Sequence, residues 1–132
     1  MGSTNYLIDS QVLLFALVNP RALSPKARRI ISNMDASLFA SAATAYELAY
    51  KFQRGKLPGF ERVFVGYEHH VRRIAPSTIN VTTEHSLTAA ELDWDHGDPF
   101  DRLIAAQAPI EGATLITPDE TMQRFEPLST LW

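Results

Sequence analysis

The sequence of 132 residues contains no cysteine, so it can form neither a disulfide bond nor a thiolate metal site. No apolar run approaches the roughly 20 residues that span a bilayer, and the chain does not open with a basic segment followed by an apolar one. It also lacks a glycine-rich phosphate-binding loop, which argues against a nucleotide-dependent kinase or ATPase. We therefore expect a cytoplasmic protein without a membrane segment.

Acidic and basic residues are nearly balanced, with 15 of the first kind and 12 of the second. The formal net charge is −3, so no overall positive field attracts nucleic acid. The basic residues nevertheless gather in three short groups, at residues 26–29, 51–56 and 72–73. Arginine and lysine suit phosphate, although basic groups on helices are often only solvated surface, so local nucleic-acid contact stays open.

Short apolar runs alternate with helical patterns. The runs predict strands at residues 5–9, 37–41, 79–83 and 113–117, and a weaker one at 128–132. Helices are predicted after the first strand up to Pro20, after the N-cap Ser24, after the second strand up to Gly55, along one apolar stripe at 60–74, at 84–92, from residue 98, and in a short segment after the fourth strand. This alternation favours one α/β domain, with three α/β/α layers around a mostly parallel sheet of four to five strands.

Five acids are expected at one edge of that sheet. Asp9 ends the first strand, and Glu47 lies about one turn into the helix after the second strand. Asp98 and Asp101 begin the helix that leads to the fourth strand, and Asp119 follows that strand by two residues. Ligands of open parallel sheets bind at the carboxyl ends of the strands, where we expect these side chains to meet.

Such a group of acids requires a positive partner. Two carboxylates about 4 Å apart repel by roughly 4 kcal/mol at an effective dielectric constant near 20. Mg²⁺ or Mn²⁺ prefers oxygen ligands and would relieve this repulsion. Because such an ion activates water and stabilises charge on a phosphoryl group, the pattern predicts phosphodiester hydrolysis.

Each acid also has a plainer interpretation. Asp98 before Pro99 is a good helix N-cap, and Asp101 complements the helix dipole. Thr44 and Glu47 fit a capping box, and the other two acids fit turns. The functional interpretation therefore depends on all five acids meeting at one edge.

Other polar residues near these acids are candidates for supporting roles. Ser10 and Thr117 would be hydroxyls that support the acids. His96, beside the acid pair, is a weaker candidate for contact with metal or phosphate, against an ordinary role in a loop. His85 adds little, and no histidine forms a recognisable triad with a serine nucleophile.

The stretches "YLIDSQVLLFAL", "SAATAYELAYKFQRGKL", "HGDPFDRLIAAQA" and "LITPDETMQRF" and the closing Trp132 resemble, in order and spacing, the PIN-domain ribonucleases of the VapC type. These are toxins of bacterial toxin–antitoxin pairs. The resemblance covers nearly the whole chain. The chain departs from the family with Ser10 in place of the usual threonine, Met122 in place of a common aromatic residue, and Pro109, which we expect to interrupt its helix.

The resemblance implies an endoribonuclease that depends on Mg²⁺ or Mn²⁺. It implies a catalytic and metal-binding quartet, with Asp98 as an additional metal-site acid, and the quartet consists of Asp9, Glu47, Asp101 and Asp119. It further implies a homodimer and a cognate VapB-type antitoxin whose C-terminal segment lies across the active groove. Lys51, Arg54 and Arg102 are the leading candidates for contact with RNA phosphates.

Three rival functions remain. A PIN-like module could bind RNA or a partner without cutting it. A phosphoacceptor receiver domain also gathers aspartates at a sheet edge, but the last predicted strand lacks the lysine that such a domain needs. A DNA flap or repair nuclease would use the same acids, although this short chain has no inserted segments to grip a duplex.

Overall fold

A five-stranded, all-parallel sheet forms the centre of the computed structural model, which describes residues 4–132. The strands lie in the order β3-β2-β1-β4-β5. Their bounds are β1 (Asn5–Ile8), β2 (Ser37–Ser41), β3 (Ser77–Ile79), β4 (Ala113–Ile116) and β5 (Thr130–Leu131). The predicted three-layer α/β/α fold is confirmed, and all neighbouring strands are parallel.

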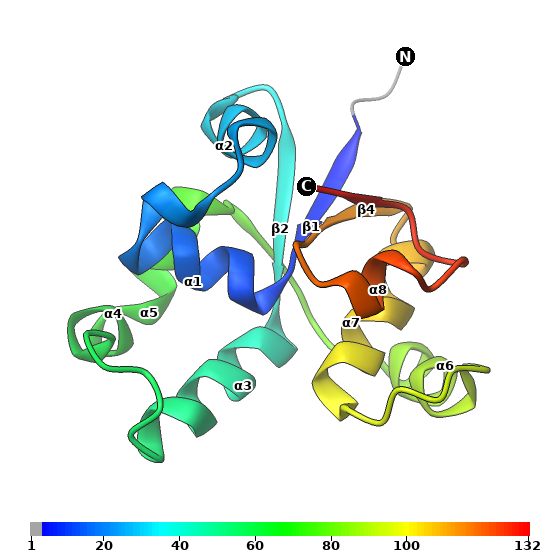
Figure 1. Ribbon diagram of the computed structural model, residues 1–132. Coiled ribbons are helices and arrows are strands. Elements are labelled where there is room, and N and C mark those ends of the chain that lie inside the picture. Colours follow the sequence, from blue (N-terminus) through cyan, green and yellow to red (C-terminus); the bar gives the residue numbers. More distant parts are fainter. Residues whose placement is uncertain (1–3) are drawn as a thin grey trace.

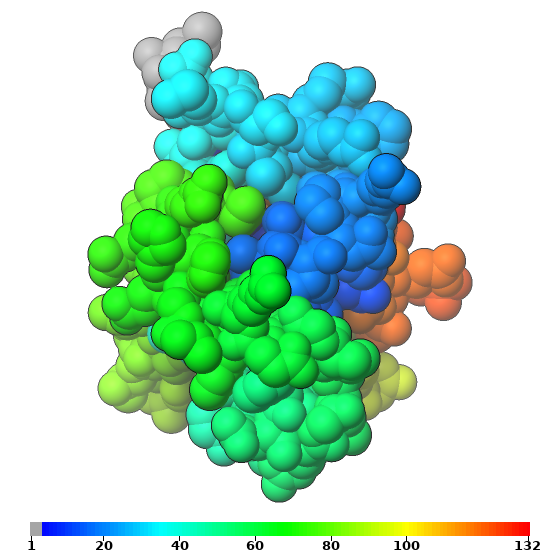
Figure 2. All heavy atoms as spheres, turned by 90° about the vertical axis from the view of Figure 1, so that its left-hand side faces the viewer, coloured from blue at the N-terminus to red at the C-terminus, as the bar shows by residue number. Residues whose placement is uncertain are grey.

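Helices cover both faces of the sheet (Figure 1). Their bounds are α1 (Ser10–Val18), η1 (Pro20–Ala22, a 3-10 helix), α2 (Pro25–Ser32), α3 (Ala42–Gln53), α4 (Glu61–Val65), α5 (Tyr67–Ile74), α6 (Thr83–Glu91), α7 (Pro99–Ile110) and α8 (Glu120–Gln123). Helices α1, α2, α4 and α5 form one outer layer, which Figure 2 shows from outside above α3. Helices α6, α7 and α8 form the other layer.

The two central strands divide their side chains between two cores. Leu7 of β1 and Leu115 of β4 belong to the core under α7 and α8, whereas the next residues, Ile8 and Ile116, belong to the core under α1, α2, α4 and α5. All four side chains are fully buried. This alternation explains why the strands are continuously apolar, because a parallel sheet with two covered faces exposes neither side to water.

Local sequence signals place most element ends correctly. The side chain of Ser24 accepts a hydrogen bond from the backbone N–H of Ala27, as expected of an N-cap. Gly55 has a φ of 69°, a left-handed conformation that favours glycine after the end of α3. Pro109 does not interrupt α7, which ends one residue later at Ile110; the proline therefore falls in the last turn.

Two predicted elements were placed wrongly. The apolar stripe at residues 60–74 forms two helices, α4 and α5, which are separated at Gly66. The third strand was predicted at residues 79–83 but spans Ser77–Ile79, so the two share only Ile79. It cannot continue to residue 83 because Thr82 caps α6 by accepting a hydrogen bond from the N–H of His85. No helix within residues 4–132 is both long enough and apolar enough to cross a membrane.

Candidate acidic metal site

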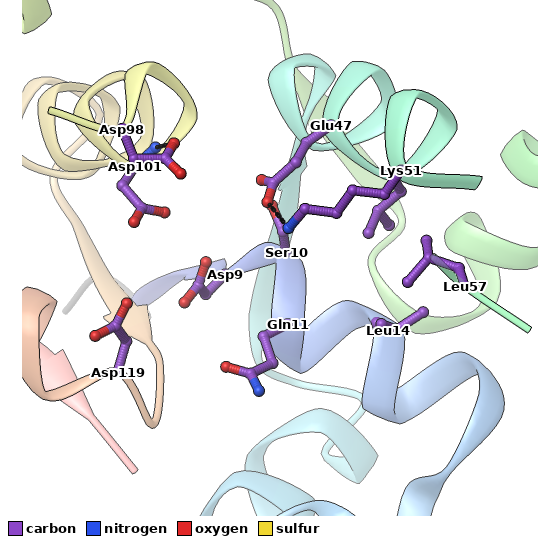
Figure 3. A pocket seen from close by; sticks show the side chains of 11 residues that line it. Asp9, Ser10, Gln11, Leu14, Glu47, Lys51, Leu57, Asp98, Asp101 and Asp119 are labelled. Atoms are coloured by element: carbon purple, nitrogen blue, oxygen red, sulfur yellow. Dashed lines mark hydrogen bonds and ion pairs between the residues drawn. The ribbon is translucent and has the colours of Figure 1, made fainter. Parts of the chain in front are cut away.

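The acids meet where the strand order reverses direction. The chain passes from β1 to β2 and β3 on one side, and β4 and β5 occupy the other side. Such a switch point leaves a crevice at the carboxyl ends of the strands. A cavity of about 330 Å³ lies there, with all five predicted acids in its wall: Asp9, Glu47, Asp98, Asp101 and Asp119. Figure 3 shows them projecting into it from the residue after β1, from α3, from the start of α7 and from the loop after β4.

Asp9 is the most deeply placed aspartate. It is 5% exposed, and its Oδ2 accepts a 2.6 Å hydrogen bond from Oγ1 of Thr117. Burial raises its pKa from 3.8 to about 6, although the Thr117 hydrogen bond acts in the opposite direction. The negative charges of Asp101 and Glu47 raise this pKa further. The Asp9 carboxylate therefore lies within electrostatic reach of two other acids of the cavity.

Glu47 faces the cavity and does not complete a capping box. The N-cap of α3 is Ser41, whose side chain accepts a hydrogen bond from the N–H of Ala43. Thr44 lies inside the first turn, where its hydroxyl is 2.9 Å from that of Ser10. The capping-box interpretation was therefore wrong, and Glu47 is free to turn inward.

Lys51 lies one helical turn after Glu47 on the same face of α3. Its Nζ is 2.7 Å from Oε2 of Glu47, and Figure 3 shows both side chains at the cavity. Burial lowers the pKa of Lys51, but the hydrogen bond and the negative charge of Glu47 more than offset this effect, so the pKa is raised. The lysine stays charged beside the acids.

Helix α7 brings an N-cap and a cavity acid together. Oδ1 of Asp98 accepts hydrogen bonds from the N–H groups of Phe100 and Asp101, at 2.9 and 3.1 Å. Asp101 is half-buried, and burial raises its pKa, although Nε2 of His96, 2.7 Å from its Oδ2, acts in the opposite direction. The capping interpretation of Asp98 is confirmed, and the side chain still lines the cavity.

Asp119 also combines a cap with a place in the cavity wall. Its Oδ1 accepts a 2.9 Å hydrogen bond from the N–H of Thr121, at the start of α8. Its own N–H donates to Oγ1 of Thr117, the same hydroxyl that donates to Asp9. Thr117 therefore links the acids at the ends of β1 and β4.

The donor set fits a hard divalent cation. The five acids in the cavity wall offer carboxylate oxygens, the ligands that such a cation prefers. Among residues 4–132, Lys51 is the only basic residue that lines the cavity. In that part of the chain, no three acidic or histidine side chains already converge closely enough to hold one ion. Three of these side chains would have to move closer together to hold one ion.

The predicted basic contacts differ in their surroundings. Lys51 lines the cavity, and the guanidinium of Arg54 lies 3.5 Å above the ring of Tyr50. Arg102 instead donates hydrogen bonds to backbone carbonyls of Ala89, Ala90, Leu92, Trp94 and His96. This guanidinium holds the segment between α6 and α7, which leaves it poorly placed for the predicted contact with RNA.

Sequence reasoning missed a buried polar network that joins β2, α6 and α7. His85 is 1% exposed; its Nε2 lies 3.0 Å from Oε2 of Glu111, and its Nδ1 accepts from the N–H of Thr82. Gln107 accepts a 2.6 Å hydrogen bond from the hydroxyl of Ser41. The Thr82–His85 spacing was the available signal, since it is the spacing of a capping box.

Comparisons with known proteins agree with this architecture. A model of the PIN domain matches residues 6–126. Ribonuclease VapC22 of Mycobacterium tuberculosis (strain ATCC 25618 / H37Rv) is 31% identical over 135 residues, which cover 98% of this chain and 99% of the relative.

Two solved structures share the fold at low identity. DNA-bound VapBC from Salmonella typhimurium gives a TM-score of 0.72 at 17% identity, over 97% of each chain. VapBC2 from Rickettsia felis, bound to a DNA fragment from its promoter, gives 0.71 at 19% identity, over 97% of this chain and 98% of that one. With a family model matching most of its length and a full-length relative above 30% identity, this chain belongs to the PIN-domain family.

Proposed function

We propose that this protein is a metal-dependent endoribonuclease and the toxin of a toxin–antitoxin pair. The observation that carries the proposal is the cavity in which acids from four separate segments meet at the switch point of the sheet. The similarity to Ribonuclease VapC22 over nearly the full length supports RNA as the substrate.

Electrostatics explain why the activity needs a cation. The cavity wall carries five carboxylates and one ammonium group, and an RNA phosphodiester would add another negative charge. Asp9, Glu47 and Asp101 would hold Mg²⁺ or Mn²⁺, with Asp119 completing the site and Asp98 at its rim. When bound, the ion would activate a water molecule and stabilise negative charge on the phosphoryl group.

The chain's own residues hold these acids in position. Thr117 keeps one oxygen of Asp9 in place, and Lys51 does the same for Glu47. His96 fixes Asp101 through the contact to its Oδ2. Ser10 also lines the cavity, and its hydroxyl contact to Thr44 joins the start of α1 to α3.

Lys51 has a second role at the cavity. Its ammonium group lies in the wall beside the acids and carries positive charge at neutral pH. Lys51 and the exposed Arg54, which directly follows α3 as its C-cap, would contact the RNA phosphates and position the strand.

The proposal includes a protein partner. The structural neighbours from Salmonella typhimurium and Rickettsia felis are VapBC complexes, which supports a cognate VapB-type antitoxin for this chain. We also propose that the protein is a homodimer. We place it in the cytoplasm, where it would meet RNA and the antitoxin.

End-mapped cleavage of total cellular RNA by the purified, antitoxin-free protein tests the function. Discrete cuts are expected with Mg²⁺ or Mn²⁺, and they should disappear with chelator or in the Asp101→Asn variant. Intact RNA in every condition, with a folded and metal-binding protein, would favour the alternative of a PIN-like module that binds RNA or a partner without cutting.

A further inference from the structure

A row of aromatic side chains lies beside the acidic cavity. Tyr46 and Tyr50 of α3 are stacked, with ring centroids 6.1 Å apart and an interplanar angle of 18°. Phe100 of α7 extends the row at one end, 5.5 Å from Tyr46, and the guanidinium of Arg54 covers Tyr50 at the other end. We call these four side chains the aromatic row.

The aromatic row is open to solvent. Tyr46 is 64% exposed and Tyr50 is 43% exposed, although large apolar surfaces are usually withdrawn from water. Neither ring belongs to the two hydrophobic cores defined by residues 4–132. Packing of the fold therefore does not account for two neighbouring exposed rings.

The position of the row follows from the geometry of α3. Tyr46, Tyr50 and Arg54 are spaced at four-residue intervals and so share one side of the helix. Glu47 and Lys51 form the adjacent parallel line, turned by roughly 100° because a helix has 3.6 residues per turn. The line of Glu47 and Lys51 faces the cavity, and the line of the aromatic row is its neighbour on the helix.

The other end of the row lies on α7, the helix that supplies two acids to the cavity. Phe100 lies between Asp98 and Asp101 in the first turn of α7, and both acids line the cavity. Tyr46 contacts this ring from α3, which supplies Glu47 to the same cavity. A strand whose phosphate enters the cavity must leave it over a neighbouring surface, and the row is one such surface.

We propose that the aromatic row stacks the bases of single-stranded RNA next to the phosphate that enters the acidic cavity. Stacking on aromatic rings and on arginine is a general mode of binding single strands, and it tolerates any base sequence. The charges on α3 suit an RNA strand. Glu47 is the one acid in α3 and is buried, while Arg54 places a positive charge at the end of the row farthest from Phe100. The proposal rests on the proposed function, which brings RNA to the cavity.

Tyr46 is the primary stacking position, because it is the more exposed ring, and Arg54 already occupies a face of Tyr50. Tyr46→Leu keeps an apolar side chain on the helix but removes the aromatic face. Tyr46→Phe keeps the face and removes only the hydroxyl. Met34→Ala is the matched control, because Met34 is 99% exposed and precedes the amino end of β2, at the opposite edge of the sheet.

The test measures RNA binding separately from cleavage. Each variant is made in the full-length protein with Asp101→Asn, so that the strand stays intact, and fluorescence anisotropy is recorded in Mg²⁺. One probe is a fluorescein-labelled single-stranded RNA of mixed sequence. The other is the same strand with abasic nucleotides, which keeps every phosphate and removes every base.

If the row stacks bases, loss of the Tyr46 ring should weaken RNA binding only when the strand carries bases. Tyr46→Leu should weaken binding of the intact strand by about 5- to 150-fold, which corresponds to the stacking of one base. Binding of the abasic strand should not change. Tyr46→Phe and Met34→Ala should bind both strands like the parent.

Two results would overturn the proposal. One is equal binding of the intact strand by Tyr46→Leu and the parent, or an equal loss with both strands. The other is a change of oligomeric state in Tyr46→Leu, measured by sedimentation, because the row would then be an interface between copies of this chain. Base-dependent binding without any cleavage by the protein that retains Asp101 would support the row and refute the proposed nuclease function.

Discussion

The buried carboxylate of Asp9 should make the protein less stable when it ionises. Asp9 is 5% exposed, and its pKa is raised from 3.8 to about 6, chiefly by burial. The folded protein therefore binds this proton more tightly than the unfolded chain does. At 1.36 kcal/mol per pH unit, the difference of about 2 units corresponds to about 3 kcal/mol.

The sign of the pH dependence follows from the raised pKa. Protonation favours folding, so this contribution is complete below about pH 4 and is lost as the pH rises through about 6. Asp9→Asn removes the ionisation and keeps an oxygen that can accept the hydrogen bond from Thr117. At pH 7.5 without metal, the free energy of unfolding of the variant should be about 3 kcal/mol higher than that of the wild type. At pH 3.5 the two proteins should have the same free energy of unfolding.

Urea denaturation of both proteins across this pH range measures the difference. Mg²⁺ should stabilise the wild type and narrow the gap at pH 7.5, since a ligand that binds only the folded state raises its stability. Asp119→Asn is the matched control, because its half-buried side chain is also a cavity acid and an N-cap, and asparagine keeps the cap. An Asp9→Asn variant no more stable than the wild type at pH 7.5 in chelator would show that ionisation of the buried Asp9 carboxylate does not destabilise the fold.

Three further changes test other parts of the account. Arg102→Ala should lower the free energy of unfolding by about 2–4 kcal/mol in urea, because it removes the donor to two carbonyls in the last turn of α6 and three in the segment between α6 and α7, and Arg102→Lys should not restore it; unchanged stability would contradict this role. Tyr67→Phe should raise thermal stability by the equivalent of about 1 kcal/mol, because the Tyr67 hydroxyl is buried and has no hydrogen-bond partner within residues 4–132, and a loss of stability would reveal one. Asp98→Asn should keep most of the RNA cleavage that Asp101→Asn loses, because asparagine preserves the cap of α7, and equal losses would make Asp98 an essential ligand.

Patterns that depend on near neighbours in the chain were readable from the sequence. The strand at residues 37–41 was predicted with the bounds that the structure shows, because a short apolar run is followed directly by a helical pattern. The N-cap Ser24 and the glycine turn at Gly55 depend on a few residues each. The meeting of the acids was predictable because parallel strands share one carboxyl edge.

Features that depend on tertiary contact were not readable. Nothing local distinguishes Ser41 from Thr44 as the N-cap of α3, because the choice depends on how the helix leaves β2. Arg102 was predicted to contact RNA phosphates. Its contacts with the carbonyls of Leu92 and Trp94 could not be read from the sequence, because they depend on how the segment between α6 and α7 folds around the guanidinium. The link between Gln107 and Ser41 joins residues 66 positions apart, which no spacing rule covers.

The proposed function requires that the acids of the cavity bind the divalent ion that the nuclease uses. A crystal of the protein grown with Mn²⁺ and measured for anomalous scattering tests this directly. We expect a manganese peak in the cavity at ligand distance from carboxylate oxygens of Asp9, Glu47 and Asp101, and we expect this peak to be lost in Asp101→Asn. A cavity without manganese in crystals of a protein that cleaves RNA with Mn²⁺, or manganese bound only elsewhere, would contradict the account.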